Sequence, residues 1–173
     1  MSNNWHNIFE QFAQQKVLIV GDAMLDAYMW GNINRQSPEA DVPVVNIKKH
    51  EKRLGGAANV AKNIANLGAT PILCSVIGDN DQGFFELMNK QGLCTKGVLQ
   101  ENRKTSVKTR IISNNKHQLR VDEEDLFLIQ SEQIFIENTI ALMEGISVII
   151  FQDYNKGVIT PNVIKKIIDA AKS

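Results

Sequence analysis

Acidic and basic side chains follow short apolar runs of the chain. Asp22 and Asp26 come after one such run, and Asp153 and Lys156 come after another. If these runs are parallel strands of one sheet, their carboxyl ends meet at the edge where open α/β sheets bind ligands. The pattern therefore indicates a polar site at that edge.

An acidic residue at the end of a strand can instead cap the helix that follows it. We favour this role for Asp79 and Asp81, which follow a third apolar run. For Asp22, Asp26 and Asp153, the residues alone leave a binding role and a capping role equally open.

A diglycine, Gly55-Gly56, precedes Asn59 in a segment that is typical of a helix start. Glycines at this position let a ligand approach the backbone, and the free N–H groups and the helix dipole favour a polar or anionic ligand. The segment is neither a Walker A loop nor the Gly-x-Gly-x-x-Gly of dinucleotide-binding proteins. A plain tight turn into a helix would also explain it.

Basic residues flank the turn pair Asn114-Asn115, which predicts a β-hairpin. Lys108 and Arg110 lie on its first strand and Arg120 on its second. Because alternate residues share one face of a strand, Lys108 and Arg110 can point together. They are candidates to bind an anion, and a solvated hairpin surface is the alternative.

The elements that must position these residues alternate along the chain. We expect strands at 16–21, 71–78, 97–100 and 147–153. Helices are expected at 4–14, 57–67, 81–91, 133–143 and 161–172, the last with Thr160 as its N-cap. This order predicts an α/β fold with a largely parallel sheet. Residues 27–50, expected as short exposed strands and loops, and the hairpin would form a small antiparallel flap beside it.

Composition excludes several classes of protein. The 173 residues are 43% hydrophobic and 22% charged, with 19 basic and 19 acidic residues, so the chain is globular and has no general field for nucleic acid or an anionic membrane. Cys74, Cys94 and three scattered histidines offer no metal site, and we expect both cysteines to be buried. Without a signal-peptide pattern or a membrane-spanning run, a soluble cytoplasmic protein is expected.

The combination of motifs is more specific than its parts. Gly55-Gly56-x-x-Asn59-x-Ala61, followed by Gly68 and Gly78, resembles the N-terminal signature of the ribokinase-like (PfkB) carbohydrate kinases. The segments 21–28, 35–44 and 153–157 narrow the resemblance, which runs over essentially the whole chain, to kinases of D-glycero-D-manno-heptose 7-phosphate. In many bacteria such a kinase is the N-terminal half of a bifunctional protein that makes ADP-heptose.

The resemblance implies a ribokinase-like three-layer sandwich with a β-strand lid. Residues 1–173 would be the N-terminal portion of one kinase domain, with lid segments at about 27–50 and 104–122, and the C-terminal part of the fold would be absent. The lid often forms a dimer interface in this family, so a homodimer is expected.

The activity implied is transfer of the γ-phosphoryl group of ATP, with Mg²⁺, to C1 of the heptose, for lipopolysaccharide core synthesis. Asp26 would bind sugar hydroxyls, together with Gly55, Gly56 and Asn59 at the helix start. Asp22 and Asp153 are further candidates for the substrate site, and the sugar phosphate would be held by cations. The candidate cations are Lys108, Arg110, Arg120 and Lys156. Gln36, Asp41 and Gln152 depart from the family pattern, and none of them is assigned to the site.

The family's catalytic base is the Asp of a Gly-Ala-Gly-Asp motif, and this sequence contains no such motif. We therefore expect a piece of a longer kinase that is inactive alone. One alternative is another sugar kinase of the family, acting on fructose 6-phosphate, ribose or a nucleoside. Another is a non-catalytic module that binds sugar phosphates or dimerises.

Overall fold

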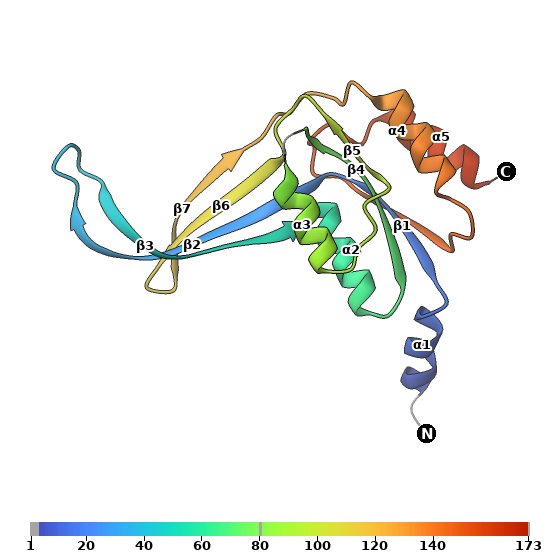
Figure 1. Cartoon of the computed structure of the whole chain (residues 1–173), viewed down its shortest axis with the longest axis horizontal. Helices are drawn as coiled ribbons and strands as arrows, with labels where there is room; N and C mark the ends of the chain where they lie inside the picture. Colours follow the sequence, from blue (N-terminus) through green and yellow to red (C-terminus); the bar gives the residue numbers. More distant parts are fainter. Residues whose placement is uncertain (1–3, 80, 173) are drawn as a thin grey trace.

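A computed structural model describes residues 4–79 and 81–172, which form two β-sheets and five helices (Figure 1). The first sheet is parallel throughout, with strand order β5-β4-β1-β8. Its strands are β1 (Lys16–Gly21), β4 (Thr70–Gly78), β5 (Val98–Glu101) and β8 (Val148–Gln152). The helices are α1 (Asn4–Phe12), α2 (Gly56–Asn66), α3 (Gln82–Lys90), α4 (Glu132–Ala141) and α5 (Pro161–Ala171). The predicted α/β fold with a parallel sheet is confirmed.

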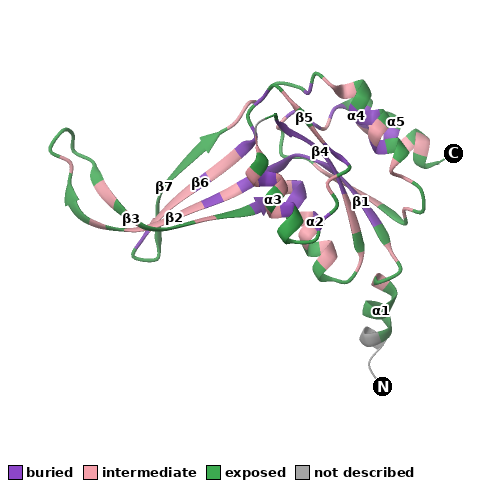
Figure 2. Ribbon diagram, viewed as in Figure 1, coloured by how far each residue is buried: buried purple, intermediate pink, exposed green. Residues whose placement is uncertain are grey.

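Alternate residues of β1 pack into two different layers. Val17 and Ile19 belong to the apolar cluster that includes α2 and α3, whereas Leu18 and Val20 belong to the cluster that includes α4 and α5. The buried residues of Figure 2 accordingly concentrate where the helices meet this sheet. A strand buried on both faces is expected for a parallel sheet between helical layers. The result is the predicted three-layer arrangement.

The helix boundaries follow the predicted signals. Asp81 caps α3 by accepting a hydrogen bond from the backbone N–H of Phe84 (3.0 Å), and Thr160 caps α5 by accepting one from Val163 (3.0 Å). Gly68 ends α2 with a positive φ of 96°. Asp81 and Thr160 bind backbone N–H groups that have no partner within the helix, and Gly68 adopts the left-handed conformation that often follows a helix end. These are local features, so the sequence around each helix end was enough to predict the boundary.

The second sheet is larger than expected. It has the order β3-β2-β6-β7, formed by β2 (Ala23–Gln36), β3 (Pro43–Gly55), β6 (Ser106–Ser113) and β7 (Lys116–Glu123). The prediction of short strands and loops at 27–50 was wrong, because β2 and β3 are strands of 14 and 13 residues that pair as one long hairpin. The prediction of an antiparallel flap was also wrong in part, because β2 and β6 pair in parallel.

The burial of two features differs from expectation. The strand β8, predicted to be buried, lies at the edge of the parallel sheet, where the side chain of Val148 is 50% exposed. Cys94 is exposed, because it lies in the connection between α3 and β5 rather than within an element. Cys74 is buried as predicted, and its burial raises the pKa of its thiol to about 12.

None of the helices in the described part of the chain combines the length and the hydropathy needed to span a membrane.

Candidate sugar-binding site

The second sheet has one charged face, and its other face is largely apolar on β2, β6 and β7 but carries His50 and Lys52 on β3. The charged face carries two rows of register partners that run across β3, β2, β6 and β7. These rows are Arg53–Asp26–Lys108–Asp122 and Glu51–Tyr28–Arg110–Arg120. Register partners share a face, and alternate residues change face. Strand pairing alone therefore gathers these eight side chains, of which four are predicted site residues: Asp26, Lys108, Arg110 and Arg120.

An ion pair joins the middle strands of this charged face. The guanidinium of Arg110 donates to a carboxylate oxygen of Asp26 across 2.5 Å, and each side chain is only 22% exposed. A charge-assisted bond at this distance orients both groups. The same two residues were expected to bind the hydroxyls and the phosphate of one sugar, so the structure brings these two candidates together.

A second set of charges continues from the sheet to the loop after β8. The ammonium of Lys108 lies 3.1 Å from Asp122 and 3.6 Å from Glu124, and the ammonium of Lys156 lies 2.9 Å from Glu124. Arg120 lies 2.9 Å from Asp122. Glu124 therefore joins the second sheet, which we call the lid, to the loop after β8. Three of the candidate cations (Lys108, Arg110 and Arg120) lie on one face of the lid, and Lys156 reaches this face from the loop.

Burial alone would raise the pKa of Asp122, but its hydrogen bonds with Lys108 and Arg120 outweigh this effect, so that its pKa is lowered.

Aromatic rings support the cations. Tyr28 and Trp30 stack with ring centroids 5.4 Å apart, and the guanidinium groups of Arg53 and Arg110 lie 4.9 Å and 5.3 Å from the centre of the Tyr28 ring. A cation over an aromatic face is attracted by the ring quadrupole and loses side-chain freedom. Tyr28 thus holds Arg110 in place from one side while Asp26 holds it from another.

Asp22 has a structural role, unlike Asp26. Its side chain is buried, and its carboxylate accepts hydrogen bonds from the backbone N–H groups of Tyr154 (2.7 Å), Lys156 (3.1 Å) and Val158 (3.1 Å). The carboxylate therefore fixes the loop that carries Lys156. Asp153 in the same loop is exposed and accepts a hydrogen bond from the backbone N–H of Asn155.

The diglycine lies directly against these acids. A Cβ on Gly55 would be 2.7 Å from a carboxylate oxygen of Asp26, and one on Gly56 would be 2.3 Å from the carbonyl oxygen of Asp22. Gly56 also has a positive φ of 55°, which glycine adopts without strain. Asn59 is exposed on the first turn of α2. The glycines thus allow Asp26 to lie beside the start of a helix, as a sugar site at this position requires.

Sequence reasoning missed several members of this cluster. Tyr28, Asp122 and Glu124 were not named as site residues, although each contacts a predicted candidate. Arg53 was not named either, although it is the register partner of Asp26. The period-2 spacing of Asp26 with Tyr28, and of Arg120 with Asp122 and Glu124, was the signal that could have found them. The assignment of individual residues to a substrate stays a prediction.

The described residues include no group of three or more His, Cys, Asp or Glu side chains arranged to hold a metal ion. The chemistry of the charged face is that of a binding surface: a carboxylate accepts hydrogen bonds from hydroxyl groups, and guanidinium groups bind phosphate oxygens. These groups can bind and orient a phosphorylated polyol.

Comparison with known proteins agrees with this chemistry. The pfkB family of carbohydrate kinases matches residues 14–172. The "Bifunctional protein HldE" of Pelobacter propionicus is 39% identical over 96% of this chain, and that of Helicobacter pylori is 42% identical over 91%. The chain spans only about a third of these relatives, 35% of each.

Solved structures show the same fold at low identity. Phosphofructokinase-2 from Escherichia coli in complex with fructose 6-phosphate superposes with a TM-score of 0.64 at 13% identity, over 91% of this chain and 51% of that protein. The protein titled Sa239 gives a TM-score of 0.67 at 15% identity, over 91% of this chain and 51% of the other. The fold, the motifs and the sequence match agree, and the chain belongs to the pfkB family of carbohydrate kinases.

Proposed function

We propose that this chain is the sugar-binding part of a cytoplasmic kinase for D-glycero-D-manno-heptose 7-phosphate. The kinase would transfer the γ-phosphoryl group of ATP to C1 of the sugar, for ADP-heptose and lipopolysaccharide core synthesis. Membership of the family and the relatives named HldE support this proposal. The main structural observation in support of this proposal is the Asp26–Arg110 ion pair beside the diglycine.

Each part of the site has a separate task. Asp26 accepts hydrogen bonds from the sugar hydroxyls, and the start of α2, with Asn59, binds the sugar from the other side. Arg110 and Arg120 are register partners on β6 and β7, so their guanidinium groups can bind one phosphate together. Lys156 and Lys108, which Glu124 joins, add positive charge at the margin of the site. Fixing the sugar in this way supplies the positioning that phosphoryl transfer requires.

ATP and Mg²⁺ belong to the proposed reaction, but the described residues do not gather ligands for the metal. The sequence also has no Gly-Ala-Gly-Asp motif to supply the base. We therefore expect no heptose-dependent release of ADP by the 173-residue chain in a coupled assay, with the kinase half of a curated relative as the positive control. Heptose-dependent turnover of ATP by the chain alone would contradict the proposal that the chain supplies only the sugar-binding part.

Sugar binding by the chain is testable directly by calorimetry with heptose, heptose 7-phosphate and fructose 6-phosphate. We expect heptose 7-phosphate to bind most tightly. Asp26→Asn should weaken the binding of heptose and of heptose 7-phosphate alike, by about 10- to 100-fold. The substitution removes a charged hydrogen-bond acceptor for the sugar hydroxyls.

Arg110→Gln should weaken the binding of heptose 7-phosphate much more than that of heptose, because it removes a ligand of the phosphate as well as the partner that orients Asp26. Asp41→Asn, at the exposed end of the β2–β3 hairpin, is the matched control and should change nothing. Equal binding of all three sugars, or unchanged binding by the Asp26 variant, would refute the proposal.

We also propose that two copies pair through the apolar face of the lid. The rows Ala27–Thr109–Val121 and Met29–Ile111–Leu119 form this face on β2, β6 and β7. Leu119 is 57% exposed and Val121 is 43% exposed. Exposed apolar side chains in adjacent rows favour association with another apolar surface.

A further inference from the structure

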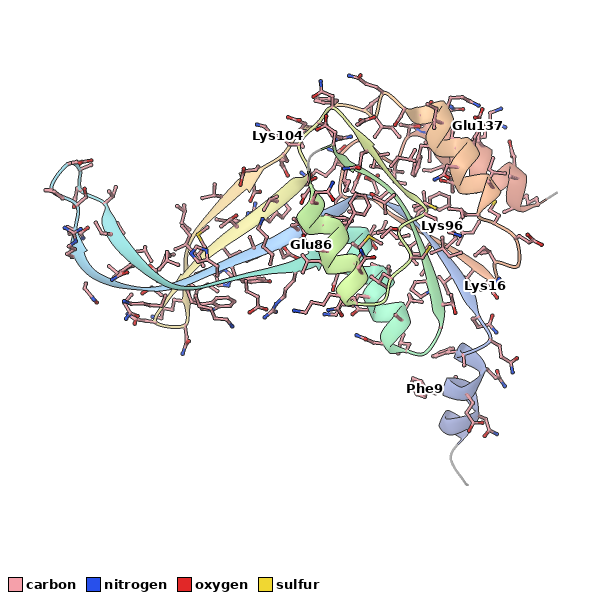
Figure 3. The ribbon with its side chains drawn as sticks, viewed as in Figure 1. Phe9, Lys16, Glu86, Lys96, Lys104 and Glu137 are labelled. Atoms are coloured by element: carbon pink, nitrogen blue, oxygen red, sulfur yellow. The ribbon has the colours of Figure 1, made fainter. Side chains whose placement is uncertain are left out.

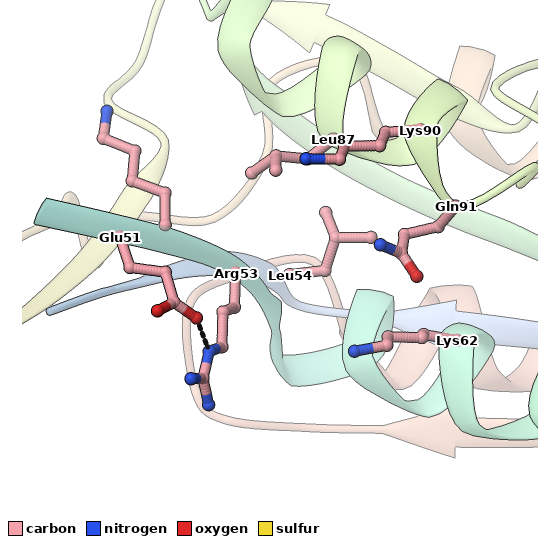
Figure 4. A pocket seen from close by; sticks show the side chains of 8 residues that line it. Glu51, Arg53, Leu54, Lys62, Leu87, Lys90 and Gln91 are labelled. Atoms are coloured by element: carbon pink, nitrogen blue, oxygen red, sulfur yellow. Dashed lines mark hydrogen bonds and ion pairs between the residues drawn. The ribbon is translucent and has the colours of Figure 1, made fainter.

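A basic hollow lies beside the edge strand β3, between this strand and two helices. It has a volume of about 290 Å³ and is bounded by β3, the middle of α2 and the end of α3 (Figure 4). Glu51, Lys52, Arg53, Leu54, Lys62, Leu87, Lys90 and Gln91 line it. Figure 4 shows Lys62, Lys90 and Gln91 directed toward the space between the two helices and the strand.

Positive charge in this hollow is not balanced. Its single carboxylate, Glu51, is already ion paired with Arg53 and, across 3.0 Å, with Lys49. The hydrogen bonds from Arg53 and Lys49 lower the pKa of Glu51 to about 2.

The side-chain ammonium groups of the three lysines of the hollow (Lys52, Lys62 and Lys90) form no hydrogen bond or ion pair with any other described residue.

The walls of the hollow favour a compact anion with an organic part. Leu54 is 4% exposed and forms an apolar floor, and Leu87 is half-buried beside it. A partly apolar wall lowers the local dielectric and strengthens the attraction between an ammonium group and an anion. The amide of Gln91 can donate further hydrogen bonds. Phosphate oxygens can accept bonds from several such donors at once.

We propose that the hollow formed by β3, α2 and α3 is a second anion site, which binds a small phosphorylated molecule. Its three lysines distinguish this site from the candidate sugar site. Lys62 and Lys90 come from helices that carry no residue of the charged rows, and Lys52 is a register partner of Ala27 on the opposite face of the lid. Glu51 and Arg53 belong to both regions, since they line the hollow and also lie in the charged rows.

The test is an NMR titration of the chain with inorganic phosphate and with pyrophosphate, at constant ionic strength. The backbone amides of Leu54, Lys62 and Gln91 should shift in a saturable way, with pyrophosphate binding more tightly. The double variant Lys62→Gln/Lys90→Gln should weaken this binding about tenfold, because it removes two of the four cations from a partly exposed site. A Lys96→Gln/Lys166→Gln variant removes the same charge elsewhere and should bind as the unmodified chain does; Lys96 is labelled in Figure 3.

Three outcomes would overturn the proposal: no saturation, equal binding by Lys62→Gln/Lys90→Gln, or equal weakening by the control variant. Arg110→Gln distinguishes this site from the candidate sugar site. It should leave the titration unchanged, and loss of the shifts in that variant would place the phosphate on the charged face of the lid. Neither result depends on the identity of the sugar or on kinase activity.

Discussion

Two aspartates four residues apart show how position decides the role of a carboxylate. Asp22 directly follows β1, and its buried carboxylate accepts hydrogen bonds from three backbone N–H groups. Asp26 lies on β2, on the charged face of the lid, and its partner is the side chain of Arg110. The sequence left a binding role and a structural role open for both. Only the topology separates them, because the partners lie 84 to 136 residues away in the chain.

The Asp22 contacts predict a large effect on stability. Asp22→Asn replaces one carboxylate oxygen by an NH₂ group, which would face the N–H groups of Tyr154 and Lys156. We expect the free energy of unfolding to fall by about 2–4 kcal/mol in urea denaturation, since hydrogen bonds to a buried charge are lost and donors oppose one another. Asp153→Asn is the control and should cost less than about 1 kcal/mol, because that side chain is exposed. Equal losses in the two variants would contradict the assignment.

The diglycine predicts a second effect at the level of single residues. Gly56→Ala combines a positive φ with a Cβ that would lie 2.3 Å from the carbonyl oxygen of Asp22. Gly68→Ala has a positive φ as well, but its Cβ would meet nothing within 4 Å. We expect Gly68→Ala to destabilise the chain by about 1 kcal/mol and Gly56→Ala by about 2–4 kcal/mol. Thermal unfolding of both variants measures the difference, and similar melting temperatures would show that the close contact relaxes.

At the scale of elements, the sequence predicted the helix caps and turns, which depend on a few neighbouring residues. The caps at Asp81 and Thr160 and the turn at Asn114-Asn115 all formed as expected. The strands β2 and β3 were missed, because one face of the lid is charged and the other is only partly buried, so that no clear alternation of hydrophobicity marks them. Register shifts near Gly31 also interrupt the pattern. Parallel pairing of β2 with β6 joins distant segments and leaves no local signal.

The charged rows make the lid sensitive to acid. The folded pKa of Asp122 lies below its ordinary value of 3.8, so its contribution to stability is complete above that value and is lost as the pH falls below it. We expect Asp122→Asn to be less stable than the unmodified chain near neutral pH, and the gap to shrink as the pH falls below about 4. Urea denaturation of both chains between neutral pH and pH values below 4 measures this difference in the free energy of unfolding. A gap that stays constant with pH would mean that Asp122 acts through packing instead.

At the scale of the whole molecule, the candidate site lies where two sheets meet. Asp22, between β1 and β2, holds the loop after β8, and Glu124 at the end of the lid pairs with Lys156 of that loop. The sequence predicted part of this cluster, because Asp22, Asp26 and Lys156 follow strands of a parallel sheet. It could not predict their pairing, since eight of the charged and aromatic residues are aligned by strand register. The long hairpin of β2 and β3 extends beyond the body of the protein (Figure 1).

The shape of the lid leads to the final prediction, which concerns assembly. If the apolar face forms a dimer, Leu119→Lys/Val121→Lys should convert a dimer to a monomer, because it places two charges in the proposed contact. Light scattering after size-exclusion chromatography measures the mass over a range of concentrations. Ile134→Lys on α4 is the control, since that side chain is 61% exposed but lies far from the lid, and it should remain dimeric. A mass of 19.4 kDa for the unmodified chain at high concentration would exclude the dimer, and an unchanged mass in the double variant would place the interface on another surface.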